Sequence, residues 1–229
     1  MNTGTHTRKS DVDLKNDVLC ELNYEPGVFT SDIGVLVKDA VVTLNGFTTT
    51  YWEKHNAVCA AKRVAGISAI ADDIQVKLDG STNFTDSDIA ANAAQQMRLA
   101  PMVPDNTVKI TVREGWLTLE GEVHNWFQKN AAENAVHFLQ GVRGIYNAIT
   151  IQPSEISNDI EADIRLSLQR NAILDADEVI VDVVGSKVTL RGKVRTHTEK
   201  DEAQRVAWTC PGVTSVTNDL SVNWAWLTD

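Results

Sequence analysis

The sequence predicts an α+β protein made of three tandem modules, each with two helices packed on one face of a three-stranded sheet. A string of one apolar residue, Thr, Leu, one polar residue and Gly occurs three times along the chain. Another glycine stands twenty residues after each string, and an apolar residue preceded by Asp stands thirty residues before each string's leucine. Recurrence at fixed offsets is the signature of repeated structural units. The string glycines are Gly46, Gly121 and Gly192, and the later glycines are Gly66, Gly141 and Gly212.

Each module is predicted to begin with an amphipathic helix. Apolar residues recur there at i, i+4 and i+8, which places them on one helical face. Ser10 with Asp13, and Thr85 with Asp88, match the capping-box pattern with Asp in place of Glu. The apolar positions are Leu14, Val18 and Leu22, then Ile89, Ala93 and Met97, then Ile160, Ile164 and Leu168.

Two strands and a second helix are expected next. The β-branched runs at 33–37, 108–112 and 179–183 predict first strands, and short turns join them to the strings, which is typical of hairpins. The second helices are expected at 52–64, 127–139 and 198–209, and the later glycines suit left-handed caps after them. The last strands are expected near 74–78, 148–151 and 220–224.

The repeat also predicts the domain limits. The string leucines are 75 and 71 residues apart, and the modules are expected to span residues 10–78, 85–153 and 156–224. The linker-like stretches are Asp79-Gly80-Ser81-Thr82-Asn83 and Pro153-Ser154. A module of this size has a small core of its own, so we expect the modules to pack against one another. The string leucines Leu44, Leu119 and Leu190 are expected in these cores.

Composition limits the functional classes. A chain with 43% hydrophobic and 23% charged residues is typical of folded proteins, and its net charge of −10 disfavours nucleic-acid binding. No apolar run is long enough for a transmembrane helix, and the N-terminal residues do not resemble a secretory signal. We therefore expect a cytoplasmic protein. Cys20, Cys59 and Cys210 are expected to be reduced, although a Cys20–Cys59 bridge is an alternative.

Catalytic and metal-binding patterns are missing from the sequence. It contains no G-x-S-x-G, P-loop, G-x-G-x-x-G or H-E-x-x-H pattern. The five histidines fall at different offsets from the string glycines, and we interpret them as scattered surface residues. We therefore expect no enzyme activity, no metal site and no cofactor.

The repeat resembles a known family. The helix–strand–strand–helix–strand order, the Leu-x-Gly that ends each second strand, and the Gly-Val or Gly-Ile after each second helix are similar to the BON domain. The resemblance covers residues 10–224. It implies a non-enzymatic bacterial module associated with envelope stress, phospholipid membranes or transport-associated proteins. Members of the family are often exported or lipidated, whereas this sequence shows neither signal.

Two surface features are candidate binding sites. Strand alternation places four basic residues on one side of the third module's second strand, where they form a stripe that could bind an anionic ligand. Ion pairing with Glu178 and Asp182 is the competing interpretation. In the first two modules, three apolar residues lie where an open sheet face should be polar, and we expect them to be buried between modules or against a partner. The stripe consists of Lys187, Arg191, Lys193 and Arg195, and the apolar residues are Val41, Phe47 and Trp116.

These features favour a stress-associated or transport-associated binding protein that engages phospholipid surfaces or protein partners. The alternative is a chaperone-like or structural stress protein that makes transient protein contacts without lipid.

Overall fold

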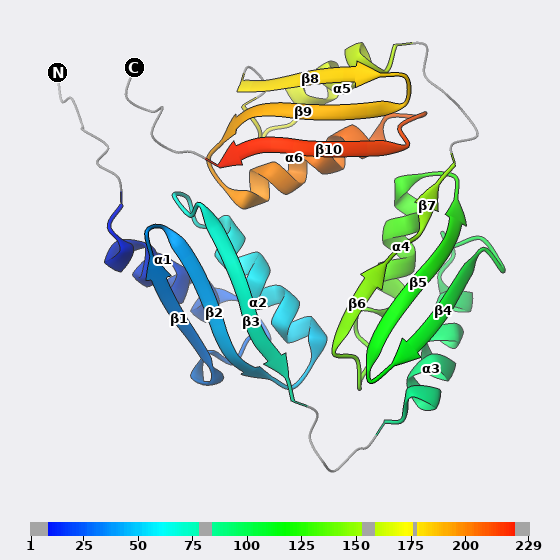
Figure 1. The fold of residues 1–229 in the computed structure, drawn as a ribbon, viewed down its shortest axis with the longest axis horizontal. Helices are drawn as coiled ribbons and strands as arrows, with labels where there is room; N and C mark the ends of the chain where they lie inside the picture. Colours follow the sequence, from blue (N-terminus) through cyan, green and yellow to red (C-terminus); the bar gives the residue numbers. More distant parts are fainter. Residues whose placement is uncertain (1–8, 78–83, 153–158, 176–177, 223–229) are drawn as a thin grey trace.

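The protein is described by a computed structural model that covers residues 9–77, 84–152, 159–175 and 178–222. The three predicted modules are present, and each has the order helix, strand, strand, helix, strand (Figure 1). Each has its own hydrophobic core between two helices and one sheet. The α+β prediction is therefore confirmed. The predicted limits at 78, 153, 156 and 224 lie outside the described residues.

The elements of the first module are α1 (Asp11–Tyr24), the short helix η1 (Thr30–Asp32), β1 (Ile33–Lys38), β2 (Val41–Thr48), α2 (Tyr51–Arg63) and β3 (Ala69–Val76). The second contains α3 (Asp86–Leu99), β4 (Val108–Arg113), β5 (Trp116–Val123), α4 (Trp126–Val136), β6 (Gly144–Asn147) and β7 (Thr150–Ile151). The third contains α5 (Ile160–Gln169), β8 (Val179–Val184), β9 (Lys187–Val194), α6 (His197–Thr209) and β10 (Ser215–Val222).

The string strand is the middle strand of every sheet. It pairs antiparallel with the strand before it and parallel with the strand after the second helix. Leu44, Leu119 and Leu190 point into the three cores and are 0% exposed, as predicted. The last strands begin earlier than predicted, because parallel backbone pairing includes residues without an apolar pattern, such as Asp72 and Asp73.

The string glycines are required by a close backbone approach. Gly46, Gly121 and Gly192 have φ values of 119°, 146° and 121°. A Cβ atom at Gly121 would lie 2.0 Å from the carbonyl oxygen of Thr107 at the start of β4, and the other two glycines face an equivalent oxygen at the same distance. Any side chain there would push the first two strands apart.

The first helices begin as their capping patterns predict. Ser10 with Asp13, and Thr85 with Asp88, form complete capping boxes. In addition, Asp11 accepts hydrogen bonds from the backbone N–H groups of the β1–β2 turn at 2.8 and 2.9 Å. This contact fixes the first helix to the hairpin, and Asp86 makes the same contact in the second module.

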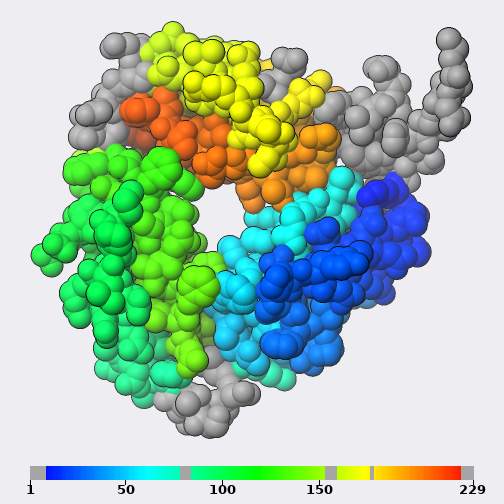
Figure 2. Space-filling view, turned by 180° about the vertical axis from the view of Figure 1, so that it is seen from behind, coloured from blue at the N-terminus to red at the C-terminus, as the bar shows by residue number. Residues whose placement is uncertain are grey.

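The three modules form a ring in which the second helices α2, α4 and α6 face the centre (Figure 1). The space-filling view shows an opening between the modules (Figure 2). In Figure 1 the strands of all three modules lie in front of the helices. The sheet surfaces that no helix covers therefore share one side of the ring.

The three contacts between modules use equivalent positions. The first residue of each second helix lies near the residue sixteen positions after another module's string glycine. Tyr51 contacts His137 in this way, with ring centroids 5.3 Å apart. Trp126 and Trp208 line one pocket together. At the third contact, Lys62 of the first module lies near His197 of the third, where its positive charge helps to lower the pKa of His197.

Candidate functional site

The open sheet face, meaning the side of each sheet opposite its helices, exposes large apolar side chains. In the second module Trp116 is 55% exposed and Tyr146 is 67% exposed. Val41 and Phe47 occupy the corresponding face of the first module at 37% and 40% exposure. Exposed apolar groups that share one face are typical of interaction surfaces. The remaining large apolar residues on these faces are Leu36, Ile180 and Val184.

The expectation that modules bury Val41, Phe47 and Trp116 between them is wrong. The contacts between modules are made on the helical side of the sheets, so these residues remain on the outside of the ring. Their role as a partner surface stays a prediction.

Two aromatic side chains of this face are held in place. Trp116 lies over Gly144 of the neighbouring strand, where a Cβ atom would be 2.2 Å from the indole ring. Lys77 places its Nζ atom 3.2 Å from the centre of the Phe47 ring, as a cation–π pair. Each ring therefore has a packing partner on the open sheet face.

The open sheet face is close to electrically neutral although the chain carries −10 overall. Strand register places basic and acidic side chains there in nearly equal numbers, so most of the excess acid lies elsewhere. The face therefore does not repel an acidic protein or an anionic surface as the whole chain would. The basic residues are Lys38, Lys109, Arg113, Lys187, Arg191 and Lys193, and the acidic ones are Asp73, Glu120, Glu122, Asp182 and Asp219.

The basic stripe of the third module is partly neutralised. Arg191 forms an ion pair with Asp182 at 2.8 Å. Arg195 pairs at 2.9 Å with Glu199, whose side chain is nearly buried, rather than with Glu178. Lys187 and Lys193 are exposed, and the described residues provide neither of them with an ion pair.

A second group of residues lies at the contact between the first two modules. The rings of His55 and His137 meet edge to face, with centroids 4.5 Å apart. His137 is 8% exposed, and its Nε2 atom is buried without a hydrogen-bond partner in the described structure. The His55 ring also contacts the Cys59 sulfur at 3.3 Å.

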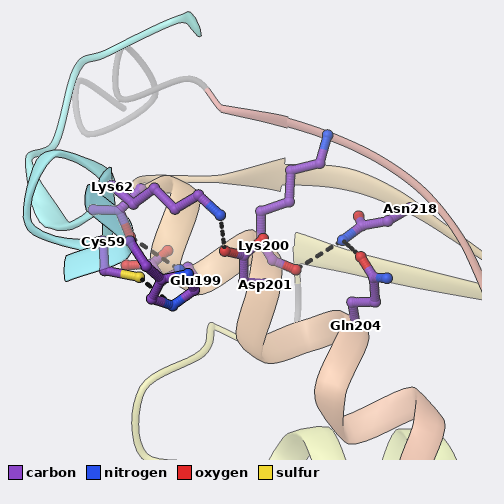
Figure 3. A network of polar contacts seen from close by, with 9 residues as sticks. Cys59, Lys62, Glu199, Lys200, Asp201, Gln204 and Asn218 are labelled. Atoms are coloured by element: carbon purple, nitrogen blue, oxygen red, sulfur yellow. Dashed lines mark hydrogen bonds and ion pairs between the residues drawn. The ribbon is translucent and has the colours of Figure 1, made fainter. Parts of the chain in front are cut away.

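The third module contacts the first through a mixed polar contact. His197 has a buried Nε2 atom without a hydrogen-bond partner among the described residues. Beside it, Lys62 of α2 and Asp201 of α6 form an ion pair at 2.7 Å (Figure 3). The expectation of scattered surface histidines is therefore wrong for His55, His137 and His197, which lie where the modules meet.

Burial changes the acid–base properties of these contacts. Burial lowers the pKa of His55, His137 and His197. The pKa of His137 is lowered further by neighbouring His55, because two positive imidazoles would repel each other. Burial also raises the pKa of Tyr51 to about 12. The contacts are therefore suited to neutral side chains.

Comparison with known proteins identifies the repeat. The family model described as "BON domain" matches residues 10–77, 85–153 and 157–223. The chain belongs to the BON domain family. It is 30% identical over 122 residues to the "Osmotically-inducible protein Y" of Escherichia coli strain K12, covering 52% of this chain and 61% of that protein. This chain therefore spans less than two thirds of the curated relative it matches.

Two solved structures also match the BON chain. One is described as the C-terminal domain of CdsD, "the structural protein of the Type III secretion system of Chlamydia trachomatis"; its identity is 12% and its TM-score 0.25. This match covers 94% of the present chain and 100% of the other. A second CdsD structure matches at 13% identity with a TM-score of 0.24 and covers 92% of both chains.

The three BON modules share polar contacts that the sequence interpretation missed. A lysine eight residues after each string glycine donates to a backbone carbonyl in the last strand of its module or, in the second module, between β6 and β7, at 2.6–2.7 Å. In the second and third modules an asparagine joins the same strand to the helix, as Asn218 does through the Lys200 carbonyl (Figure 3). The constant spacing between these lysines and the string glycines could have predicted this contact from the sequence. The lysines are Lys54, Lys129 and Lys200.

A pocket of about 240 Å³ lies between the second and third BON modules. Trp126, Phe127 and Trp208 line it, and its lining contains no Lys, Arg, Asp or Glu. Phe127 is 45% exposed, whereas Trp208 packs against the cores of two modules. Trp52 packs on Phe138 of the second module, with ring centroids 5.9 Å apart.

The described residues show none of three other features: a metal site, a membrane-spanning helix and a disulfide bridge. They contain no group of three or more His, Cys, Asp or Glu arranged to hold a metal ion. No helix among them is both long and apolar enough to span a bilayer. Cys20, Cys59 and Cys210 are free thiols, so the alternative Cys20–Cys59 bridge is not formed.

Proposed function

We propose that this chain is a non-enzymatic binding protein of the osmotic stress response that engages protein partners through the open sheet faces of its three BON modules. The osmotic association is suggested by the printed name of the Escherichia coli relative. The observation that carries the proposal is the display of exposed aromatic and aliphatic side chains on one side of the ring.

Three sheets on one side favour multivalent binding. When one sheet has bound, the other two are held close to the same partner. Three individually weak contacts can therefore give a high overall affinity. Trp116 and Tyr146 provide large contact areas whose ordering costs little side-chain entropy, because aromatic side chains have few rotatable bonds. The near neutrality of the face is compatible with apolar contact.

Site-specific photo-crosslinking tests the proposal. Tyr146 on the open sheet face and Leu99 on α3 are both 67% exposed, so replacing each with a photoreactive phenylalanine gives a matched pair. In cells under osmotic stress, the probe at Tyr146 should form discrete protein adducts and the probe at Leu99 should not. Equal adducts from both positions would contradict the proposal. A diffuse smear from Tyr146 alone would favour the chaperone-like alternative.

Binding to anionic phospholipid is the second candidate, and the stripe of the third module supports it. Two of its four basic residues are engaged in ion pairs, which leaves Lys187 and Lys193. Each basic residue near an anionic surface contributes about 1 kcal/mol, so the pair provides about 2 kcal/mol. Flotation with anionic vesicles at low salt should then be weak, and Lys187→Glu with Lys193→Glu should abolish it. Lys15→Glu with Arg98→Glu, at exposed positions on the first helices of two modules, makes the same charge change away from the open sheet faces and serves as the control.

We also propose a cytoplasmic location, which the three free thiols support, because reducing compartments keep cysteines unpaired. Cell fractionation followed by thiol labelling checks this. Recovery in an extracytoplasmic fraction would refute it.

A further inference from the structure

Two of the three contacts between modules contain histidines that the proposed binding surface does not explain. His55 and His137 lie at one of these contacts, and His197 lies at the other. Each of these histidines comes from a second helix or its last turn. The ring is therefore closed in part by side chains that change charge near neutral pH.

Neutral imidazoles fit these contacts and charged ones do not. His55 and His137 meet edge to face at 4.5 Å, so charging both would place two cations in direct contact. Protonation of His137 at Nε2 would also bury an additional N–H group at an atom that has no acceptor in the described structure. The same holds for Nε2 of His197, which already experiences the positive charge of Lys62.

The surrounding charges are mixed, and burial outweighs them. Glu133 and Asp201 favour the charged imidazoles, whereas Lys62 and Lys200 oppose them. A backbone hydrogen bond with Ile67 also favours charged His197. Burial is nevertheless the largest influence on all three histidines and lowers each pKa. The uncharged Tyr51 and Cys59 complete the surroundings of the His55–His137 pair.

We propose that the ring is a pH-sensitive clasp, in which protonation of His55, His137 and His197 separates the modules while each module stays folded. Separation changes how the three open sheet faces are oriented relative to one another. Mild acidification would therefore release a partner that needs more than one sheet. The opening itself does not depend on the proposed partner, so the two ideas can fail separately.

The direction of the pH effect follows from the burial. Histidines exposed in an open ring regain an ordinary pKa of about 6.5, whereas in the closed ring the pKa is lower. The open ring therefore binds more protons as the pH falls below about 6.5, and the closed ring loses stability there. Above this range the imidazoles are neutral in both states, and closure does not depend on them.

Zero-length carbodiimide cross-linking reports ring closure in the intact chain. Lys62 and Asp201 are in contact between modules at 2.7 Å, and Lys54 and Asp72 are in contact within the first module at 3.1 Å. The ratio of the two cross-links, measured by mass spectrometry, cancels the pH dependence of the coupling chemistry. It should fall at least about threefold between about pH 7.5 and about pH 5.5, a range above the ordinary carboxylate pKa values. Far-UV circular dichroism should remain unchanged.

Variants separate the histidine effect from general acid sensitivity. His55→Gln with His137→Gln should reduce the pH dependence of the ratio. His124→Gln, at an exposed histidine beside the pocket between the second and third modules and away from the three proposed histidines, should leave it as in the wild type. The wild type decides the matter even if the double variant does not close. A constant ratio across this pH range would overturn the proposal, and so would a loss of helical signal in parallel with the ratio, because the modules would then be unfolding.

Discussion

Replacing the central leucine of the second module tests how the small cores are held together. Leu119 is 0% exposed. It lies on β5, the middle strand of the sheet, and points into the core of the second module. Leu119→Ala removes three carbon atoms, which at about 0.8 kcal/mol for each buried methylene gives about 2.4 kcal/mol of lost transfer free energy. The remaining cavity adds about 24 cal/mol for each Å³ that the core fails to fill. The expected loss is therefore about 2–5 kcal/mol.

This loss is large for a module of this size. A stability of about 0.05–0.15 kcal/mol per residue leaves each module with less than about 10 kcal/mol. Urea unfolding monitored by tryptophan fluorescence should show a clearly lower midpoint, and Leu44→Ala and Leu190→Ala should act similarly in their own modules. Thr118→Ala, one residue away on the opposite face of β5, is the matched control. If Leu119→Ala and Thr118→Ala lower the free energy of unfolding equally, the core assignment is refuted.

The remaining predictions concern the string glycines, the ion pair between the first and third modules, and metal content. Gly121→Ala should destabilise more than Gly185→Ala. Both glycines have a positive φ that strains alanine, but only at Gly121 does the new Cβ also meet a backbone oxygen, that of Thr107; equal urea midpoints would contradict this. A double-mutant cycle with Lys62→Ala and Asp201→Ala should give a coupling of about 0.2–1 kcal/mol that weakens in high salt, since the pair is partly exposed. A salt-independent coupling would argue against a simple ion pair. Elemental analysis of the purified protein should find no stoichiometric metal, and one tightly bound ion per chain would refute this.

The parts of the fold that depend on repeated chemistry could be predicted from the sequence. Leu44, Leu119 and Leu190 share one residue type at one offset because all three fill the same kind of core. The string glycines recur because every copy has the same close backbone approach. Local patterns of this kind are independent of how the modules are arranged.

The contacts between modules could not be predicted in the same way. Equivalent positions carry different residues, with Lys62, His137 and Trp208 at one of them. One contact is thus an ion pair, one a group of tilted and edge-to-face rings, and one a pair of tryptophans beside a pocket. Because the three contacts use different residue types, the histidines do not recur at one offset from the string glycines, and nothing in the sequence indicates that they lie at contacts. The pairing of Arg195 with Glu199 is different, since its i, i+4 spacing was visible in the sequence.

The head-to-tail use of two unlike surfaces has a consequence for chain association. Each module presents the start of its second helix to one neighbour and the end of that helix to the other. Interfaces of this type close when the rotation between units completes a circle and propagate when it does not. A chain opened between its first and third modules has one unfilled surface of each kind. Two opened chains therefore carry matching ends, and at high protein concentration they would exchange modules and close into a larger circle.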